Sequence, residues 1–122
     1  IAEDNLINKR LIANLLDKFG HKPIVVSSGL EAVESMNNEV DIILMDIQMP
    51  EMDGYQATEE IRKIYPNIPI IAMTAHAMAE DKKKCLDAGM NDFLPKPFKA
   101  EEVRLLLTKY QPAKTPKNIG TE

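Results

Sequence analysis

The chain has 122 residues, of which 44% are hydrophobic and 28% charged, and this balance is typical of one globular domain and excludes a disordered chain. Fifteen Lys and Arg against nineteen Asp and Glu give a net charge of −4, which disfavours binding to the phosphates of nucleic acids. The apolar runs are too short to span a membrane, and the single cysteine, Cys85, cannot form an internal disulfide. We therefore expect a cytoplasmic domain without direct membrane contact.

The first element in chain order is the apolar pair Ile1-Ala2, which leads into an acidic turn and a helix. Two residues are too few for a strand of ordinary length. We interpret the pair as the end of a truncated first strand, and we expect residues upstream of it to complete that strand.

A helix is predicted over about residues 6–19, because apolar residues recur every four positions from Ile7 to Phe19. Asn5 is a suitable N-cap for this helix. Gly20 follows its last apolar residue, where a left-handed C-cap favours glycine. The pattern therefore predicts both ends of the helix.

Further helices follow from the same kinds of signal. Ser28 and Glu31 have the spacing of a capping box, which predicts a helix from about Gly29. Gly89 ends a helix that carries Cys85 and the lysines at 82–84, which are expected to form a solvated face or, as the functional alternative, a partner-binding surface. Helical periodicity also covers residues 57–64 and 103–110.

Four more apolar runs are short and rich in branched residues, as expected of strands buried on both faces: 23–26, 42–45, 70–73 and 93–94. Alternating strand and helix favours a parallel sheet with helices on both faces. We predict an α/β, doubly wound, five-stranded domain over residues 1–110. Residues 111–122 carry no apolar period and are expected to form a flexible C-terminal tail or linker.

The residues that carry chemistry follow the predicted strands. In an open parallel sheet, ligands bind outside the carboxyl ends of the strands. Glu3 and Asp4 follow the first strand, Asp46 ends the third, Thr74 ends the fourth and Lys96 follows the fifth. Three carboxylates at one edge repel one another unless a cation compensates them, and Mg²⁺ prefers such oxygen ligands. The sequence therefore predicts a Mg²⁺ site, with Mn²⁺ as an alternative ion.

These residues, together with Met45-Asp46-Ile47-Gln48-Met49-Pro50-Glu51-Met52-Asp53-Gly54, Thr74-Ala75 and Lys96-Pro97-Phe98, resemble the receiver domain of two-component response regulators. The resemblance covers residues 1–110 and implies the flavodoxin-like strand order 2-1-3-4-5. It also implies a cis peptide bond at Lys96-Pro97.

The resemblance implies a role for each residue. Asp46 would be the phosphoacceptor and would take a phosphoryl group from phosphohistidine. Asp4 and Asp46 would bind Mg²⁺ directly, with the backbone carbonyl of Gln48, and Glu3 would act through a bound water. Lys96 and the Thr74 hydroxyl would each contact a phosphoryl oxygen. Such a domain catalyses its own aspartyl phosphorylation and dephosphorylation.

The resemblance also implies a switch. Thr74 would move toward the phosphate, and an aromatic residue on the fifth strand, here Phe93, would fill the space beneath it. Phe93 lacks the hydroxyl of the tyrosine that is common at this position, so its side chain cannot form a hydrogen bond with a partner protein. The side chains of Gln48 and His76 would overhang the phosphoryl group and set its lifetime.

Three other functions share part of this pattern. A phosphatase of the haloacid-dehalogenase type expects a second Asp two residues after the nucleophile, where this chain has Gln48. A flavin-binding domain expects a hydroxyl- and glycine-rich loop in place of the acidic turn at 3–5. A phosphorylation-independent pseudo-receiver that acts as a protein-binding module remains the alternative, although such modules usually lose one of the site residues.

The loops at 2–5, 49–54 and 74–78 look most like receivers of hybrid sensor histidine kinases. The resemblance then implies a histidine kinase domain as phosphoryl donor and a histidine phosphotransfer domain as the next acceptor. The parent protein would be a sensor kinase, through which this cytoplasmic domain could be tethered to a membrane. Stand-alone and regulator-fused receivers carry similar loops and stay open as alternatives.

Overall fold

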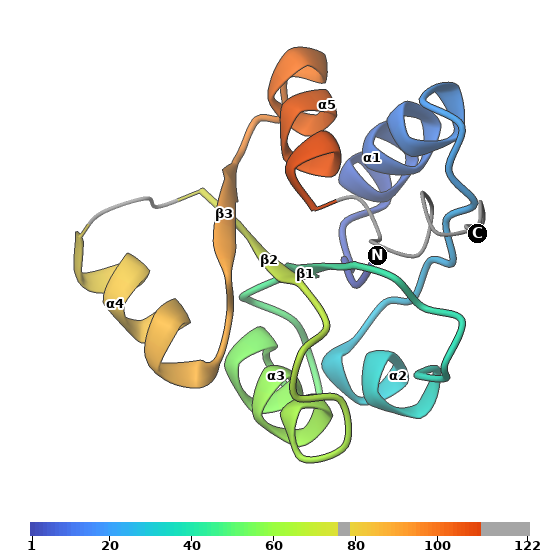
Figure 1. The fold of residues 1–122 in the computed structure, drawn as a ribbon. Coiled ribbons are helices and arrows are strands. Elements are labelled where there is room, and N and C mark those ends of the chain that lie inside the picture. The colour runs from blue at the N-terminus through green and yellow to red at the C-terminus, as the bar shows by residue number, and fades with distance from the viewer. Residues whose placement is uncertain (76–78, 111–122) are drawn as a thin grey trace, which may run out of the picture.

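The structure is a computed structural model that describes residues 1–75 and 79–110 (Figure 1). His76 and the predicted tail at 111–122 therefore lie outside the described residues. The elements in chain order are α1 (Leu6–Lys18), α2 (Gly29–Glu34), β1 (Ile43–Asp46), α3 (Gly54–Arg62), β2 (Ile70–Thr74), α4 (Ala79–Ala88), β3 (Asp92–Pro95) and α5 (Ala100–Lys109). Among these described helices, none has the length and apolar character needed to cross a membrane.

The centre of the fold is a parallel sheet in the order β1-β2-β3. Leu44 of β1 pairs with Ile71 of β2, and Met73 of β2 pairs with Leu94 of β3. Every residue of β1 and β2 is buried, which explains why both read as continuous apolar runs. The predicted parallel α/β sheet is confirmed.

The five predicted strand positions are all paired, but only three of them form ladders among the described residues, and the truncated first strand and the second are held by isolated bridges. Ala2 forms one parallel bridge with Val26 and another with Met45. The lateral order is therefore the Val26 segment, the Ala2 segment, β1, β2 and β3, which is the predicted order 2-1-3-4-5. Around these bridges, the Val26 N–H donates to the Ile1 carbonyl and the Asp46 N–H donates to the Ala2 carbonyl.

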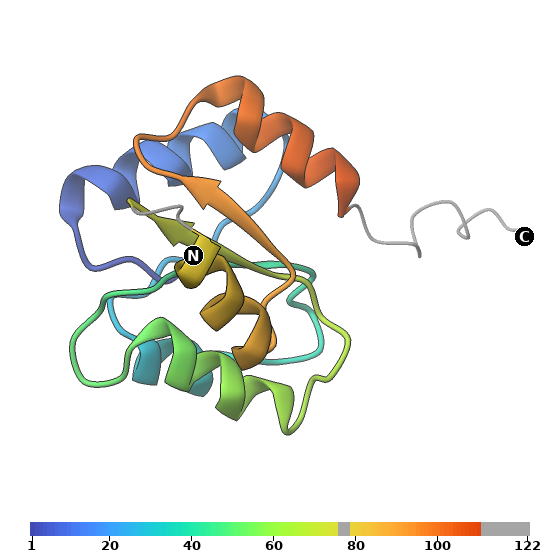
Figure 2. The same cartoon turned by 90° about the vertical axis from the view of Figure 1, so that its left-hand side faces the viewer.

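Helices cover both faces of the sheet, as Figure 2 shows edge-on. On one face, α1 and α5 bury Ile12, Leu16, Val103 and Leu107 against the strands. On the other face, α2, α3 and α4 pack through apolar residues that include Ala32, Ala57, Ile61 and Cys85. Cys85 is a free cysteine and is buried in this part of the core.

The predicted helix ends are mostly confirmed. The Asn5 side chain accepts a hydrogen bond from the Asn8 N–H, and Gly20 has the positive φ of 88° expected of a left-handed C-cap. Ser28 caps α2 by accepting from the Glu31 N–H. The Glu31 carboxylate, however, accepts from the N–H of Ser27, so the predicted reciprocal box is displaced by one residue.

Candidate functional site

The carboxyl ends of the strands bring the predicted site residues to one edge of the sheet. Asp46 ends β1, Thr74 ends β2 and Lys96 directly follows β3. Glu3 comes directly after the bridged residue Ala2, and its N–H donates to the Val26 carbonyl. The side chain of each is thus placed by backbone pairing that the sequence pattern predicts.

Three of these residues form an ion-pair triad. Lys96 Nζ lies 3.0 Å from Oε1 of Glu3 and 3.2 Å from Oδ2 of Asp46. The Glu3 side chain is 0% exposed and that of Asp46 is 7% exposed. Two buried carboxylates therefore share one ammonium, which leaves the triad with a formal charge of −1.

Because two carboxylates are buried beside one ammonium, the pKa of Asp46 is shifted. Burial, reinforced by the hydrogen-bonded and charged neighbour Glu3, raises the pKa of Asp46 to about 6, against the lowering effect of Lys96. Burial alone would lower the pKa of Lys96, but its ion pair with Glu3 and its proximity to Asp46 outweigh that effect and raise the pKa. The site therefore favours an additional cation.

The same edge has the ligands for a hard divalent ion. Glu3, Asp4 and Asp46 each offer a carboxylate oxygen, and these oxygens all lie within 4.8 Å of one another. Oε1 of Glu3 is buried and has only the ion pair with Lys96, without the alignment of a hydrogen bond. Buried, incompletely satisfied carboxylate oxygens beside an exposed one fit Mg²⁺, which takes oxygen ligands and keeps several waters.

The loop after β1 is held tightly against Asp46. The Gln48 N–H donates to Oδ1 of Asp46 at 3.2 Å, and the Gly54 N–H donates to the Ile47 carbonyl at 2.8 Å. A Cβ on Gly54 would lie 2.4 Å from the Asp46 carbonyl oxygen, so only glycine allows α3 to begin this close. Asp53 caps α3 in a reciprocal capping box with Gln56.

The predicted switch residues lie on the same face of neighbouring strands. Thr74 is buried at the end of β2. Phe93 on β3 pairs with Ala72, two residues before Thr74, and packs partly buried against the core on the α4 side. Lys82 Nζ of α4 lies 5.6 Å from the centre of the Phe93 ring. A movement of the Phe93 ring would therefore change its contact with Lys82 of α4.

A cavity of about 470 Å³ opens beside Asp46, Thr74 and Lys96. Among the polar residues of its wall are four that the sequence prediction did not assign to the site: Asp53, Tyr55, Asp81 and Lys84. The capping spacing of Asp53 and Gln56 could have placed α3 here. For Asp81 and Lys84 no local pattern was available, because their position depends on how α4 packs.

Two site predictions concern the backbone and the loop before α4. The cis peptide bond at Lys96-Pro97 is confirmed. The position of His76, predicted to influence phosphate lifetime, lies in the undescribed gap between Ala75 and Ala79. The structure thus brings together Glu3, Asp4, Asp46, Thr74 and Lys96, and it places Gln48 beside them through its backbone.

Comparison with known proteins agrees with this geometry. The family described as the response regulator receiver domain matches residues 1–108. Over 111 residues the chain is 38% identical to the sensor histidine kinase RcsC of Escherichia coli K12, covering 90% of this chain and 12% of RcsC. The chain thus spans about an eighth of the length of that relative.

Two solved structures are similar along most of their length. The receiver domain of sensor histidine kinase PA1611 from Pseudomonas aeruginosa PAO1, with a magnesium ion coordinated in its active site cleft, has a TM-score of 0.83 and 43% identity, covering 89% of this chain and 92% of that one. The receiver domain of Ssk1 from Saccharomyces cerevisiae, in complex with the histidine phosphotransfer protein Ypd1, has a TM-score of 0.83 and 29% identity, covering 89% and 84%.

Proposed function

This chain belongs to the response regulator receiver domain family of two-component signalling, and we propose that Asp46 is its phosphoacceptor in a Mg²⁺-dependent reaction. The observation that carries the proposal is the ion-pair triad of Asp46, Glu3 and Lys96, of which Asp46 and Lys96 line an open cavity. Family membership alone does not assign the role, because a pseudo-receiver shares the fold. The retained acidic pair and lysine support phosphorylation.

The proposed step is phosphoryl transfer from a phosphohistidine. An oxygen of the Asp46 carboxylate attacks phosphorus, the P–N bond breaks, and its electron pair remains on the imidazole. The Gln48 N–H bond to Oδ1 fixes the orientation of the carboxylate. The Lys96 ammonium, 3.2 Å from Oδ2 of Asp46, would form an ion pair with a phosphoryl oxygen. The Thr74 hydroxyl would donate a hydrogen bond to another phosphoryl oxygen.

The residues that would hold Mg²⁺ are Asp4 and Asp46, with the Gln48 carbonyl and with Glu3 through a water. When bound, the ion supplies positive charge that offsets repulsion between the incoming phosphate and the three carboxylates. Mn²⁺ has the same preference for oxygen and would substitute.

Phosphorylation would then shift the domain between two packings. Thr74 would be drawn toward the phosphate, and Phe93, on the same face one residue pair away, would repack beneath it. Because Lys82 lies over the Phe93 ring, α4 would carry the change to the surface. The side chains of Gln48 and His76 are proposed to set the lifetime of the phosphate.

The partners proposed are a histidine kinase domain as donor and a histidine phosphotransfer domain as acceptor. Support comes from the similarity to receivers of hybrid sensor kinases and to a receiver solved with a histidine phosphotransfer protein. We place the domain in the cytoplasm, within a longer sensor kinase, where the buried Cys85 stays reduced.

The test uses phosphoramidate, a small donor whose P–N bond mimics phosphohistidine, with intact-mass detection. The chain should gain one phosphoryl group when Mg²⁺ is present and none when it is chelated. Asp46→Asn should abolish the gain, whereas Asp87→Asn, an equal charge change on an exposed position of α4, should not. A folded chain that gains no phosphoryl group would contradict the proposal and favour a binding module.

A further inference from the structure

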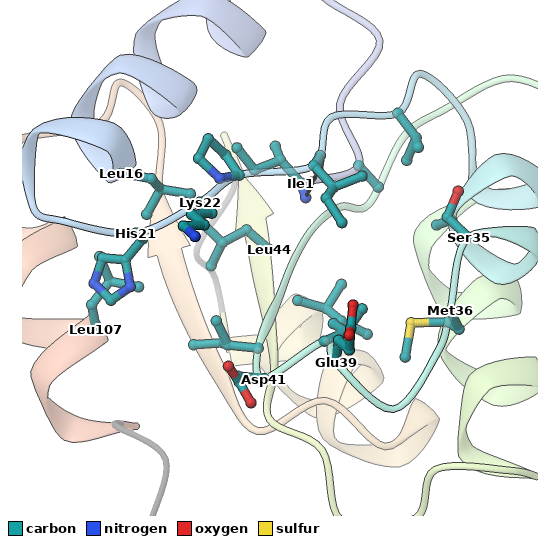
Figure 3. Close-up of a pocket in the computed structure, with 18 of the residues that line it drawn as sticks. Ile1, Leu16, His21, Lys22, Ser35, Met36, Glu39, Asp41, Leu44 and Leu107 are labelled. Atoms are coloured by element: carbon teal, nitrogen blue, oxygen red, sulfur yellow. Dashed lines mark hydrogen bonds between the residues drawn. The ribbon is translucent and has the colours of Figure 1, made fainter. Parts of the chain in front are cut away.

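The Phe93 side chain lines neither of the two cavities of about 580 and 470 Å³ in the described part of the chain. The larger cavity opens beside the first residues of β1, with Leu107 and Met36 on opposite sides of it (Figure 3). The smaller one lies beside Asp46 and includes Thr74 in its wall. A movement of the Phe93 ring toward Thr74 would therefore bring it from outside the smaller cavity to its wall.

The residues on either side of Phe93 in β3 are held on the opposite face of the sheet. The Asp92 carboxylate accepts from Lys109 Nζ at 2.9 Å and from the Tyr110 hydroxyl at 3.0 Å, and both donors lie at the C-terminal end of α5. Leu94 is buried in the core beneath α1 and α5. These contacts fix the backbone of β3, so the Phe93 ring would change its place by side-chain rotation and not by a shift of the strand.

The β2 residue beside Phe93 is small. Phe93 pairs with Ala72, which lies two residues before Thr74 on the same face of the sheet. The side chain of Ala72 is a single methyl group, so it places no long side chain between the Phe93 ring and Thr74. Because β2 offers no such obstacle, a restraint on the ring comes from an element that packs on this face of the sheet.

Lys82 of α4 provides such a restraint. Its Nζ lies 5.6 Å from the centre of the Phe93 ring, which is within the range of a cation–π interaction. Within residues 1–75 and 79–110, Lys82 forms no salt bridge with a carboxylate. The Phe93 ring is therefore the contact that its ammonium makes in this part of the chain.

The contact between Lys82 and Phe93 belongs to the unphosphorylated packing. Lys82 is exposed, whereas Thr74 is buried, so a ring that moved beneath Thr74 would leave the ammonium. An interaction that is made in only one of two packings stabilises that packing. By linkage, it also weakens the binding of any group that requires the other packing. Lys82 therefore acts against the packing that a phosphate on Asp46 would favour.

We propose that Lys82 is a positioning residue that holds the Phe93 ring away from Thr74 and thereby opposes phosphorylation of Asp46. The first part, the restraint of the ring, rests on the geometry of the contact. The second part rests on the proposed function of Asp46 as phosphoacceptor. A cation–π interaction at an exposed site is weak, so the expected change in affinity for a phosphoryl group is about two- to fivefold.

Proton NMR of the unphosphorylated chain tests the restraint of the ring. Protons that lie above the face of an aromatic ring resonate upfield, so the ε-methylene protons of Lys82 should resonate upfield of those of Lys83, the adjacent exposed lysine of α4. Phe93→Leu should remove this difference. Equal resonance positions for the two lysines in the original chain would overturn the restraint.

Calorimetric titration with beryllofluoride in the presence of Mg²⁺ tests the second part, because beryllofluoride is a stable mimic of a phosphoryl group on a carboxylate. Lys82→Met should bind beryllofluoride about two- to fivefold more tightly than the original chain. Lys83→Met removes the same charge from the neighbouring position and should leave the affinity unchanged. Lys82→Arg keeps a cation over the ring and should also behave like the original chain.

The Phe93→Leu background completes the test, because Lys82→Met should have no effect on beryllofluoride affinity once the ring is absent. Equal affinities for Lys82→Met and Lys83→Met, or a gain that persists without the ring, would overturn the second part of the proposal. A chain that binds no beryllofluoride would instead contradict the acceptor role of Asp46, and with it the second part. The NMR comparison decides the restraint of the ring in either case.

Discussion

Glu3 is completely buried, and its carboxylate oxygen Oε1 lies 3.0 Å from the ammonium of Lys96, which it shares with Asp46. A buried carboxylate is costly unless it is paired. One ammonium compensates two such groups here, so the metal-free site retains an excess negative charge. This excess accounts for the raised pKa of Asp46 and for the fit to a divalent cation.

Removing the Lys96 charge should therefore destabilise the metal-free protein. We expect Lys96→Met to lower the free energy of unfolding by about 2–3 kcal/mol at neutral pH, because two buried carboxylates lose their partner. Mg²⁺ should restore more stability to the variant than to the original chain. Urea denaturation with and without Mg²⁺ measures both effects.

The matched control is Lys63→Met, since Lys63 pairs with Glu60 on the exposed surface of the molecule. This variant should leave the urea midpoint nearly unchanged. If Lys96→Met behaved in the same way, the ammonium would not be compensating the buried carboxylates.

The pH dependence of phosphorylation should follow Asp46. Its pKa is raised from 3.8 to about 6, mainly by burial, so at pH 5 the folded, metal-free site is mostly protonated. A protonated carboxyl neither coordinates metal nor attacks phosphorus, so at limiting Mg²⁺ the phosphorylation rate should fall as pH drops below about 6. Saturating Mg²⁺ should move this fall to lower pH, and an unchanged profile would contradict the account.

The same raised pKa has a consequence for stability. Between pH 4 and 6 the folded protein holds a proton that the unfolded chain has released, so this carboxyl makes unfolding easier as pH rises through that window. Asp46→Asn should abolish this slope and stabilise the metal-free protein at pH 7 by about 1–2 kcal/mol after solvent screening. Urea midpoints at pH 4 and pH 7 test the sign.

Gly54 should prove indispensable for the position of Asp46. In Gly54→Ala, the new methyl group would lie 2.4 Å from the Asp46 carbonyl oxygen and 2.9 Å from the Ile47 Cα. We expect a loss of about 1–3 kcal/mol in stability, together with weaker Mg²⁺ binding, because the loop must move.

Gly20→Ala is the appropriate comparison for Gly54→Ala. Gly20 has a positive φ of 88° but nothing within 4 Å of an added Cβ. This variant should lose about 1 kcal/mol through backbone strain and keep its Mg²⁺ affinity. Equal Mg²⁺ affinities in the two variants would show that Gly54 does not position the acceptor loop.

Arg62 should be the most important charged residue for stability outside the site. Its guanidinium donates to the carbonyls of Gly89, Tyr65 and Ile68 and to the Asn91 side chain, which joins the end of α3 to the turn before β3. Arg62→Met should cost about 2–4 kcal/mol in unfolding free energy, because it leaves these acceptors without a donor.

Arg62→Lys should lose nearly as much unfolding free energy as Arg62→Met, because an ammonium lacks the planar array of N–H donors of a guanidinium. Arg104→Met removes the same charge from an exposed pair with Glu101 and should change the urea midpoint little. Indistinguishable midpoints for Arg62→Met and Arg104→Met would contradict the structural role of Arg62.

The sequence was sufficient to predict the sheet and its edge, because a strand buried on both faces is apolar throughout and ligand residues follow its carboxyl end. Asp46, Thr74 and Lys96 were located in this way. It could not show that residues 23–26 form a bridge at Val26 and no ladder, since the periodicity of an apolar run does not specify how far its backbone pairs. Nor could it place Lys84 at the cavity, because that depends on how α4 packs across the sheet.

Locating the phosphoryl group tests the role of Asp46 most directly. After phosphorylation with phosphoramidate and Mg²⁺, borohydride reduces an aspartyl phosphate to homoserine, and peptide mass spectrometry identifies the reduced residue. If Asp46 is the phosphoacceptor, homoserine appears at position 46 and at no other aspartate. Homoserine at position 4 or 53, or a phosphoryl group that resists borohydride on a hydroxyl or imidazole, would contradict it.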